Sequence, residues 1–342
     1  MKYIHTLTGL RGLAALMVFV SHASNEGILP NIWSMGFGQI GVMIFFVLSG
    51  FLMSHLYAHE DFNYNNIKKY ALARIGRVFP LYFSLLIISG IISNYFYNDF
   101  IYNFNEIDKI VRAFALIDAP YVFWSVPVEV QFYIVFLGFW FLHKKYSSPY
   151  VLIIYIALTM TPTIFLYLVY SDLARIVSLY SYAFFIGALT ALFQEHIKNS
   201  EKVRTIASFA GYPLIILLFT YTPVIREQYG LVYSESTYLR TWGDPVTWII
   251  IYGIFICAIL NSRSLAFLNY KPFVYLGNIS YGFYLMHYPA LIFFKDLNIN
   301  PILQFSLALI ATMIVSQVTY HYFEKPVGKI IRNTPYKKTR SI

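Results

Sequence analysis

The chain has 342 residues, of which 58% are hydrophobic, 20% aromatic and 12% charged. Soluble domains carry about 25% charged residues, so this composition and the mean hydropathy of +0.59 exclude a soluble domain and indicate an integral membrane protein. The single cysteine, Cys257, excludes a disulfide framework and a Cys-pair redox motif, and the dispersed basic residues do not form a nucleic-acid-binding face.

Apolar windows of about 20 residues, the length that crosses a bilayer as a helix, recur along the whole chain. Ten such windows predict an all-α, polytopic integral membrane protein with about ten transmembrane helices. The windows cover residues 7–24, 38–57, 78–97, 121–142, 150–170, 176–194, 205–222, 245–261, 273–294 and 302–322.

The connections between the windows alternate in charge. Most Lys and Arg residues fall in the set that includes both termini and the loop 58–77. Because basic loops stay on the cytoplasmic side, we predict cytoplasmic termini and a multi-pass protein of the inner (cytoplasmic) membrane. Residues 1–325 are then the membrane domain, and residues 326–342 are a basic cytoplasmic tail. Ser21 and Ala23 also have the spacing that ends a cleavable signal peptide, an alternative that N-terminal sequencing would test.

The first window carries two ionisable residues in an otherwise apolar run. Arg11 and His22 are eleven positions apart, and eleven steps of about 100° return to nearly the same helix face. At a rise of about 1.5 Å per residue, they lie about 16 Å apart along the helix. Ionisable residues in a membrane are costly and indicate function.

Two more ionisable residues are predicted to reach the depth of His22. Glu129 lies early in the fourth window, which runs inward, and His287 lies late in the ninth, which runs outward. A histidine beside a carboxylate or a second histidine can act as a general base, because the partner fixes its tautomer. Each of the three residues alone could be a packing residue, but three at one depth favour a site.

A basic pair precedes the apolar part of the third window. Arg74 and Arg77 share a helix face, and paired guanidinium groups bind phosphate well. The alternative is anchoring of the helix by positive charge on the cytoplasmic side. His55 and His59 have the spacing of metal ligands on a helix, but no third ligand is nearby in the sequence, so no metal site is predicted.

Six motifs occur in order along nearly the whole chain. They are LRGLAALMVFVSH (10–22), GVMIFFVLSGFLM (41–53), ARIGRVFPLY (73–82), WSVPVEVQFY (124–133), GNISYGFYLMHYPAL (277–291) and YHYFEKP (320–326). Together they resemble the acyltransferase-3 family of polytopic membrane acyltransferases. The resemblance implies transfer of an acyl group, usually acetyl, from acyl-CoA to a hydroxyl of a cell-surface glycan.

The resemblance also implies roles for individual residues. The family's catalytic histidine corresponds to His22 and its paired arginine to Arg11, while its basic third-span motif corresponds to Arg74 and Arg77. The acidic residue of its Trp-x-x-x-x-Glu motif corresponds to Glu129.

Two positions depart from the family's pattern. Many members have Asp where this chain has Thr8, and many have a second Glu where it has Val130. Glu129 must therefore act without an acidic neighbour.

Residues and resemblance together predict a membrane O-acyltransferase, of O-acetyltransferase type, whose acceptor is an O-antigen, capsule or exopolysaccharide glycan. The predicted site residues are His22 and Glu129 for catalysis, Arg11, Arg74 and Arg77 for acyl-CoA, and Trp124, Tyr284 and His287 for the acceptor. Acyl-CoA, the glycan and the lipid bilayer are the predicted partners, with no permanently bound cofactor, no metal and no nucleic acid. The alternative is a transporter or flippase of a lipid-linked or anionic solute, since buried ionisable residues also form proton relays.

Overall fold

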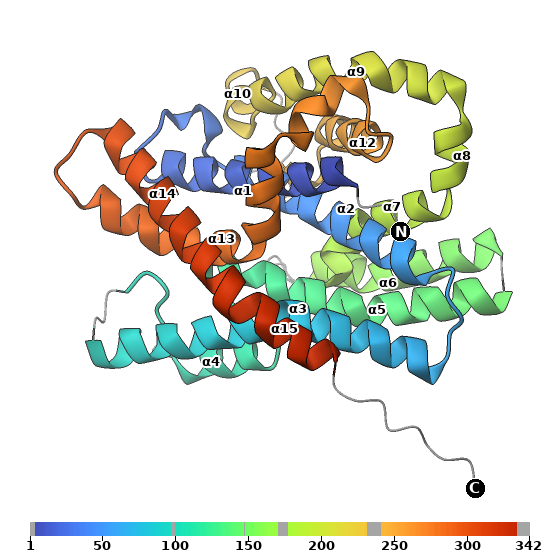
Figure 1. Ribbon diagram of the computed structural model, residues 1–342, viewed down its shortest axis with the longest axis horizontal. Coiled ribbons are helices and arrows are strands. Elements are labelled where there is room, and N and C mark those ends of the chain that lie inside the picture. Colours follow the sequence, from blue (N-terminus) through green and yellow to red (C-terminus); the bar gives the residue numbers. More distant parts are fainter. Residues whose placement is uncertain are drawn as a thin grey trace, which may run out of the picture. The chain divides into compact units, whose positions relative to one another are not determined.

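We describe the protein from a computed structural model of the chain. The structure describes residues 4–96, 100–104, 106–146, 148–169, 177–230 and 241–333, with the backbone alone over 162–169. Every regular element in these ranges is helical, which confirms the predicted all-α class (Figure 1).

The α-helices are, in chain order, α1 (His5–Asn25), α2 (Phe37–Tyr57), α3 (Tyr64–Ile91), α4 (Ile107–Phe114), α5 (Ser125–Tyr146), α6 (Pro149–Val169), α7 (Val177–Leu192), α8 (Gln194–Asn199), α9 (Glu201–Thr220), α10 (Pro223–Gln228), α12 (Pro245–Ile259), α13 (Lys271–Lys295), α14 (Pro301–Thr319) and α15 (Lys325–Arg332). Short segments of tighter or wider helix join or extend them. These are η1 (Asn31–Trp33), η2 (Ile92–Phe96), η3 (Tyr121–Trp124), η4 (Arg263–Asn269) and η5 (Tyr320–Glu324).

Each of the ten predicted spans falls mainly on a helix. Over the described residues, six helical stretches are long and apolar enough to cross a membrane, and the bent pair α12 and η4 would make a seventh. Helices α7 and α12 have only 16 and 15 residues, fewer than the about 20 that a full crossing needs. A polytopic membrane protein is confirmed, while the number ten and the side of the termini stay predictions.

The chain divides into two compact units. The first contains residues 1–55 and 178–316, and the second contains residues 56–177 and 317–342. The predicted boundary between membrane domain and tail coincides with the start of α15 in the second unit, so the predicted tail begins as a helix. Its last residues, 334–342, lie outside the described ranges.

In the first unit, α1 and α13 pack with their backbones in contact. A Cβ atom at Gly277 would overlap the carbonyl group of Thr8, and one at Gly12 would overlap the backbone of α13. Glycine permits this close approach, because any side chain would push the helices apart. His22 and His287 each follow the glycine of their own helix by ten residues. Both therefore lie about 15 Å further along, at the same level.

A buried ion pair stabilises the connection between α10 and α12 in the same unit. Nη1 of Arg226 lies 3.2 Å from Oδ2 of Asp244, and the two side chains are 3% and 0% exposed. Asp244 also caps α12 by accepting a hydrogen bond from the backbone N–H of Thr247. Arg226 and Asp244 both fall in the connection between the predicted spans 205–222 and 245–261. The structure adds that two of its charged residues belong to the interior.

In the second unit, α3 packs against both α5 and α15. The hydroxyl of Tyr70 donates to the backbone carbonyl of Tyr133, at 2.9 Å. Gly76 and Gly328 lie face to face, where a Cβ on either would meet the backbone of the other. This packing sets the orientation of α3 in the second unit, and with it the direction of the face that carries Arg74 and Arg77.

Candidate functional site

Two histidines meet in the first unit. Nδ1 of His22 on α1 lies 2.6 Å from Nε2 of His287 on α13. The ring planes are within 7° of each other, and the ring centroids are 4.9 Å apart. His287 is fully buried, whereas His22 keeps part of its surface exposed. The structure thus joins two of the predicted site residues, from the two helices predicted to bring them together.

The hydrogen bonds assign a proton to each ring. Nδ1 of His287 lies 2.6 Å from the carbonyl oxygen of Tyr284, and a carbonyl only accepts, so this nitrogen carries a proton. In the neutral ring, Nε2 of His287 is then an acceptor, and Nδ1 of His22 must donate to it. This tautomer leaves a lone pair on Nε2 of His22. A proton acceptor oriented by a second group is the arrangement of a general base.

Aromatic side chains surround the histidine pair. The rings of Phe19 and Tyr284 have their centroids 6.2 Å and 6.1 Å from that of His287, and the Tyr288 ring lies 5.0 Å from that of His22. Tyr284, predicted to line the acceptor end, is itself 7% exposed. Close packing of this kind holds a side chain in one rotamer, so the imidazole of His22 is held in a fixed orientation.

An acidic residue that the sequence analysis missed adjoins the pair. Glu26 follows the end of α1 and accepts hydrogen bonds from the Tyr288 hydroxyl and from Nζ of Lys295, each at 2.7 Å. Burial raises the pKa of Glu26, but the hydrogen bonds and charge of these partners outweigh it and hold the pKa below its ordinary value. Glu26 is therefore ionised at neutral pH. Its position four residues after His22 was the signal available, since such residues share a helix face.

In the second unit, Arg74 on α3 interacts with Glu129 on α5. The Arg74 guanidinium lies 5.9 Å from the centre of the Tyr133 ring, and Tyr133 forms a hydrogen bond with Glu129. Tyr57 and Tyr70 also act on Arg74 electrostatically, as Glu129 does. Two predicted site residues thus form a charge pair framed by tyrosines. The predicted role of Glu129 beside His22 stays a prediction.

Arg77 also interacts with a carboxyl group in this unit. Glu324, in η5, interacts electrostatically with Arg77. Its Oε1 atom is buried and has no hydrogen-bond partner among the described residues. Glu324 belongs to the last of the six motifs, for which no role is predicted from the sequence. Each predicted phosphate-binding arginine therefore interacts electrostatically with a carboxyl group of the same unit.

The remaining predicted residues lie on separate elements. Arg11 is in the first half of α1 and is partly exposed. Trp124 ends η3 and is 5% exposed. Across the described ranges, no three His, Cys, Asp or Glu side chains are grouped so that they could hold a metal ion.

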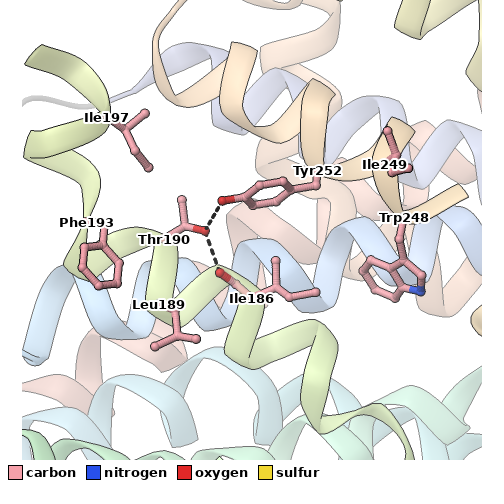
Figure 2. A pocket seen from close by; sticks show the side chains of 8 residues that line it. All are labelled: Ile186, Leu189, Thr190, Phe193, Ile197, Trp248, Ile249 and Tyr252. Carbon is pink, nitrogen blue, oxygen red and sulfur yellow. Dashed lines mark hydrogen bonds between the residues drawn. The ribbon is translucent and has the colours of Figure 1, made fainter. Parts of the chain in front are cut away.

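An apolar pocket of about 390 Å³ lies between α7, α8 and α12 in the first unit (Figure 2). Its polar groups include Thr190 and Tyr252, whose hydroxyls face each other at 3.4 Å. The lining residues are Ile186, Leu189, Thr190, Phe193, Ile197, Trp248, Ile249 and Tyr252. None of them is a predicted site residue, and the lining suits a hydrocarbon chain better than a phosphate or a sugar.

The sequence profile of the acyltransferase-3 family, described as an acyltransferase domain, matches residues 4–321. The chain belongs to this family. The match includes the histidine pair of the first unit and the Arg74–Glu129 pair of the second, so it confirms the family suggested by the six motifs.

Relatives of this acyltransferase-3 chain include named O-acetyltransferases. The peptidoglycan O-acetyltransferase OatA of Listeria monocytogenes is 24% identical, over 96% of this chain and 56% of the relative. The O-acetyltransferase OatA of Staphylococcus aureus strain NCTC 8325 is 22% identical, over 96% of this chain and 58% of the relative. The chain thus spans a little more than half the length of these relatives. No solved structure matches it.

Proposed function

We propose that this acyltransferase-3 chain is an O-acyltransferase of the inner membrane. It moves an acyl group, acetyl in the first instance, from acyl-CoA to a hydroxyl of a cell-surface or lipid-linked glycan. The observation that carries the proposal is the histidine pair, in which His287 fixes the tautomer of His22. Family membership and the names of the relatives support acetyl transfer. The Listeria relative, named for peptidoglycan, supports a glycan acceptor.

The free Nε2 lone pair of His22 supplies the chemistry. It takes the proton of the acceptor hydroxyl while the oxygen attacks the carbonyl carbon of the thioester. A C–O bond forms, the C–S bond breaks, and the imidazolium returns the proton to the CoA thiolate. The products are an acyl ester and the free CoA thiol. The same lone pair also suits a route in which Nε2 carries the acyl group before the acceptor attacks.

Loss of the acetyl-CoA thioester tests the proposal against the transporter alternative. Membranes that contain the protein should release CoA thiol from acetyl-CoA over many turnovers when a glycan acceptor is present, and the acetyl label should appear as an alkali-labile ester on the glycan. A transporter would move its solute without consuming the thioester. Thioester loss that equals that of membranes lacking the protein would refute an acyl-CoA-dependent transferase.

The donor end of the proposed site is assigned to Arg74 and Arg77, with Arg11 as a third cation. Nε of Arg74 is buried and has no hydrogen-bond partner among the described residues, so a phosphate oxygen would satisfy it. Phosphate would also compete with the carboxyl groups of Glu129 and Glu324 for the two guanidinium groups.

Arg74→Ala and Arg77→Ala are expected to weaken binding of acyl-CoA. A hydrogen bond to a charged group contributes roughly 1.5–3 kcal/mol, so the apparent KM for acetyl-CoA should rise about 10- to 150-fold. Steady-state kinetics over a range of acetyl-CoA concentrations measures it. Arg112→Ala, at an exposed position on α4, is the matched control and should leave KM unchanged. An unchanged KM in both test variants would contradict phosphate binding and favour the alternative, in which the two arginines anchor the helix by their positive charge.

Glu129→Gln is expected to lower kcat/KM for acyl transfer about ten-fold or more without loss of folded protein. Gln keeps the shape and can still bond to Tyr133, but it removes the charge that faces Arg74, and charged hydrogen bonds are worth this much. Separate values of kcat and KM then show which residue Glu129 acts through. A change confined to KM for acetyl-CoA points to Arg74, and a lower kcat with a shifted pH–rate profile points to His22. An almost silent variant would remove Glu129 from the site.

A further inference from the structure

The histidine pair orients the base but supplies no negative charge. When a carboxylate orients a catalytic histidine, it also stabilises the imidazolium that forms during proton transfer. Here the orienting group is His287, whose Nδ1 proton is committed to a carbonyl oxygen. A neutral ring accepts the hydrogen bond from His22 but carries no charge to offset the developing cation. The compensating charge must come from another group.

Glu26 has the position and the charge for this task. It acts on His22 electrostatically and lies one helical turn beyond it in the sequence. Its carboxylate is fixed on both oxygens, one by the Tyr288 hydroxyl and the other by Lys295. Tyr288 also packs against the His22 ring. A carboxylate held at two points cannot turn away from the imidazole, so its charge is preorganised.

We propose that Glu26, held by Tyr288 and Lys295, is a positioning residue that stabilises the positively charged form of His22 during acyl transfer. The proposal rests on the proposed function, because it assumes that His22 acts as the base. Lys295 offsets part of the charge of Glu26 through their ion pair. The balance between the two charges sets the electrostatic field at His22.

The groups that face His22 come from two elements. Helix α13 contributes His287, which hydrogen-bonds to the ring, and Tyr288, which packs on it. The end of α1 contributes Glu26, and α13 adds Lys295 through its ion pair with Glu26, at 2.7 Å. Lys295 is 42% exposed on its side chain and Glu26 is 16% exposed. Removing either charge should therefore change the field at His22, and in opposite directions.

The test is the pH–rate profile of acetyl transfer by the full chain in membranes, with Glu26→Gln and Lys295→Met. His22 acts only when neutral, so the rate falls as pH drops and the ring takes a proton. Glu26→Gln keeps an acceptor for Tyr288 but destabilises the imidazolium, so the acid limb should move to lower pH by about one unit. Lys295→Met leaves Glu26 uncompensated, so the acid limb should move to higher pH.

A second acid–base pair provides the control. Nζ of Lys109, on α4, and Oε1 of Glu106, just before this helix, form an exposed ion pair at 2.6 Å. Glu106→Gln and Lys109→Met make the same chemical changes outside the proposed site. Both should keep the wild-type pH–rate profile. A general effect of net charge on the membrane surface would instead move all four profiles.

Shifts in opposite directions at Glu26 and Lys295, with none in the control pair, would support the proposal. Equal profiles for all variants, or shifts in the same direction at Glu26 and Lys295, would overturn it. If Glu26→Gln is inactive at every pH, the direction of the Lys295→Met shift decides alone. These outcomes differ from failure of the proposed function, in which His22→Ala itself would keep its activity.

Discussion

His22→Ala is expected to abolish acyl transfer while the protein still folds and inserts. Loss of a general base costs about 10²- to 10⁴-fold in rate, and more if Nε2 also carries the acyl group. The side chain is partly exposed at the end of α1 and makes its hydrogen bond through Nδ1 alone to His287. Its removal therefore leaves the glycine-mediated packing of α1 on α13 untouched. Ester formation on the glycan, measured with labelled acetyl-CoA, is the readout.

His196→Ala is the matched control for the loss of an imidazole. His196 is exposed on α8, away from the histidine pair in the sequence and in no predicted role, so its variant should keep wild-type activity. Both variants should give equal yields of monodisperse protein in detergent. Near wild-type acylation by His22→Ala would exclude His22 from the mechanism.

The histidine pair could be predicted from the sequence because it depends on two regular quantities. Helical rise and span direction place His22 and His287 at a similar depth, and the structure joins them at 2.6 Å. Glu26 could not be found in this way. It lies in a predicted polar connection, where an acidic residue is ordinary. Its spacing of four residues from His22 becomes informative only with the contacts to Tyr288 and Lys295.

The residues that interact with Arg74 and Arg77 could not be predicted from the sequence either. The spacing of Arg74 and Arg77 gives their shared helix face, but the pairing of Arg74 with Glu129 depends on how α3 packs on α5. Glu324 reaches Arg77 from a segment more than 240 residues further along the chain. A contact of this kind is set by tertiary packing and leaves no local periodic signal.

Hydropathy predicted where the helices lie but not how long they are. The apolar windows behind α7 and α12 extend beyond the helices themselves, which stop at 16 and 15 residues. A window counts apolar side chains, whereas a helix ends where its backbone turns. The chain bends by 78° between α12 and η4, and Asn261, between these two elements, has a positive φ of 48°. Composition does not register such a turn.

His287 is expected to be nearly as important as His22, although it does not reach the reacting atoms. Without it, the N–H of His22 Nδ1 has no acceptor, and the ring is free to adopt the other tautomer, in which Nε2 carries the proton. His287→Ala should therefore lower kcat by at least about 10²-fold, with little change in KM for acetyl-CoA. Single-turnover and steady-state rates of glycan acetylation, measured on equal amounts of folded protein, check this.

Two further substitutions separate orientation of the base from packing. His287 is fully buried, so His287→Phe preserves an aromatic ring in the same space but offers no acceptor. His287→Gln packs less well, yet its side-chain carbonyl can accept the Nδ1 proton of His22. If His287 fixes the tautomer, Gln should recover more activity than Phe, even though Phe gives the more stable protein in thermal unfolding. The reverse order, with Phe active and Gln inactive, would show that the ring of His287 only fills space, and the assignment of Nε2 of His22 as the base would lose its structural support.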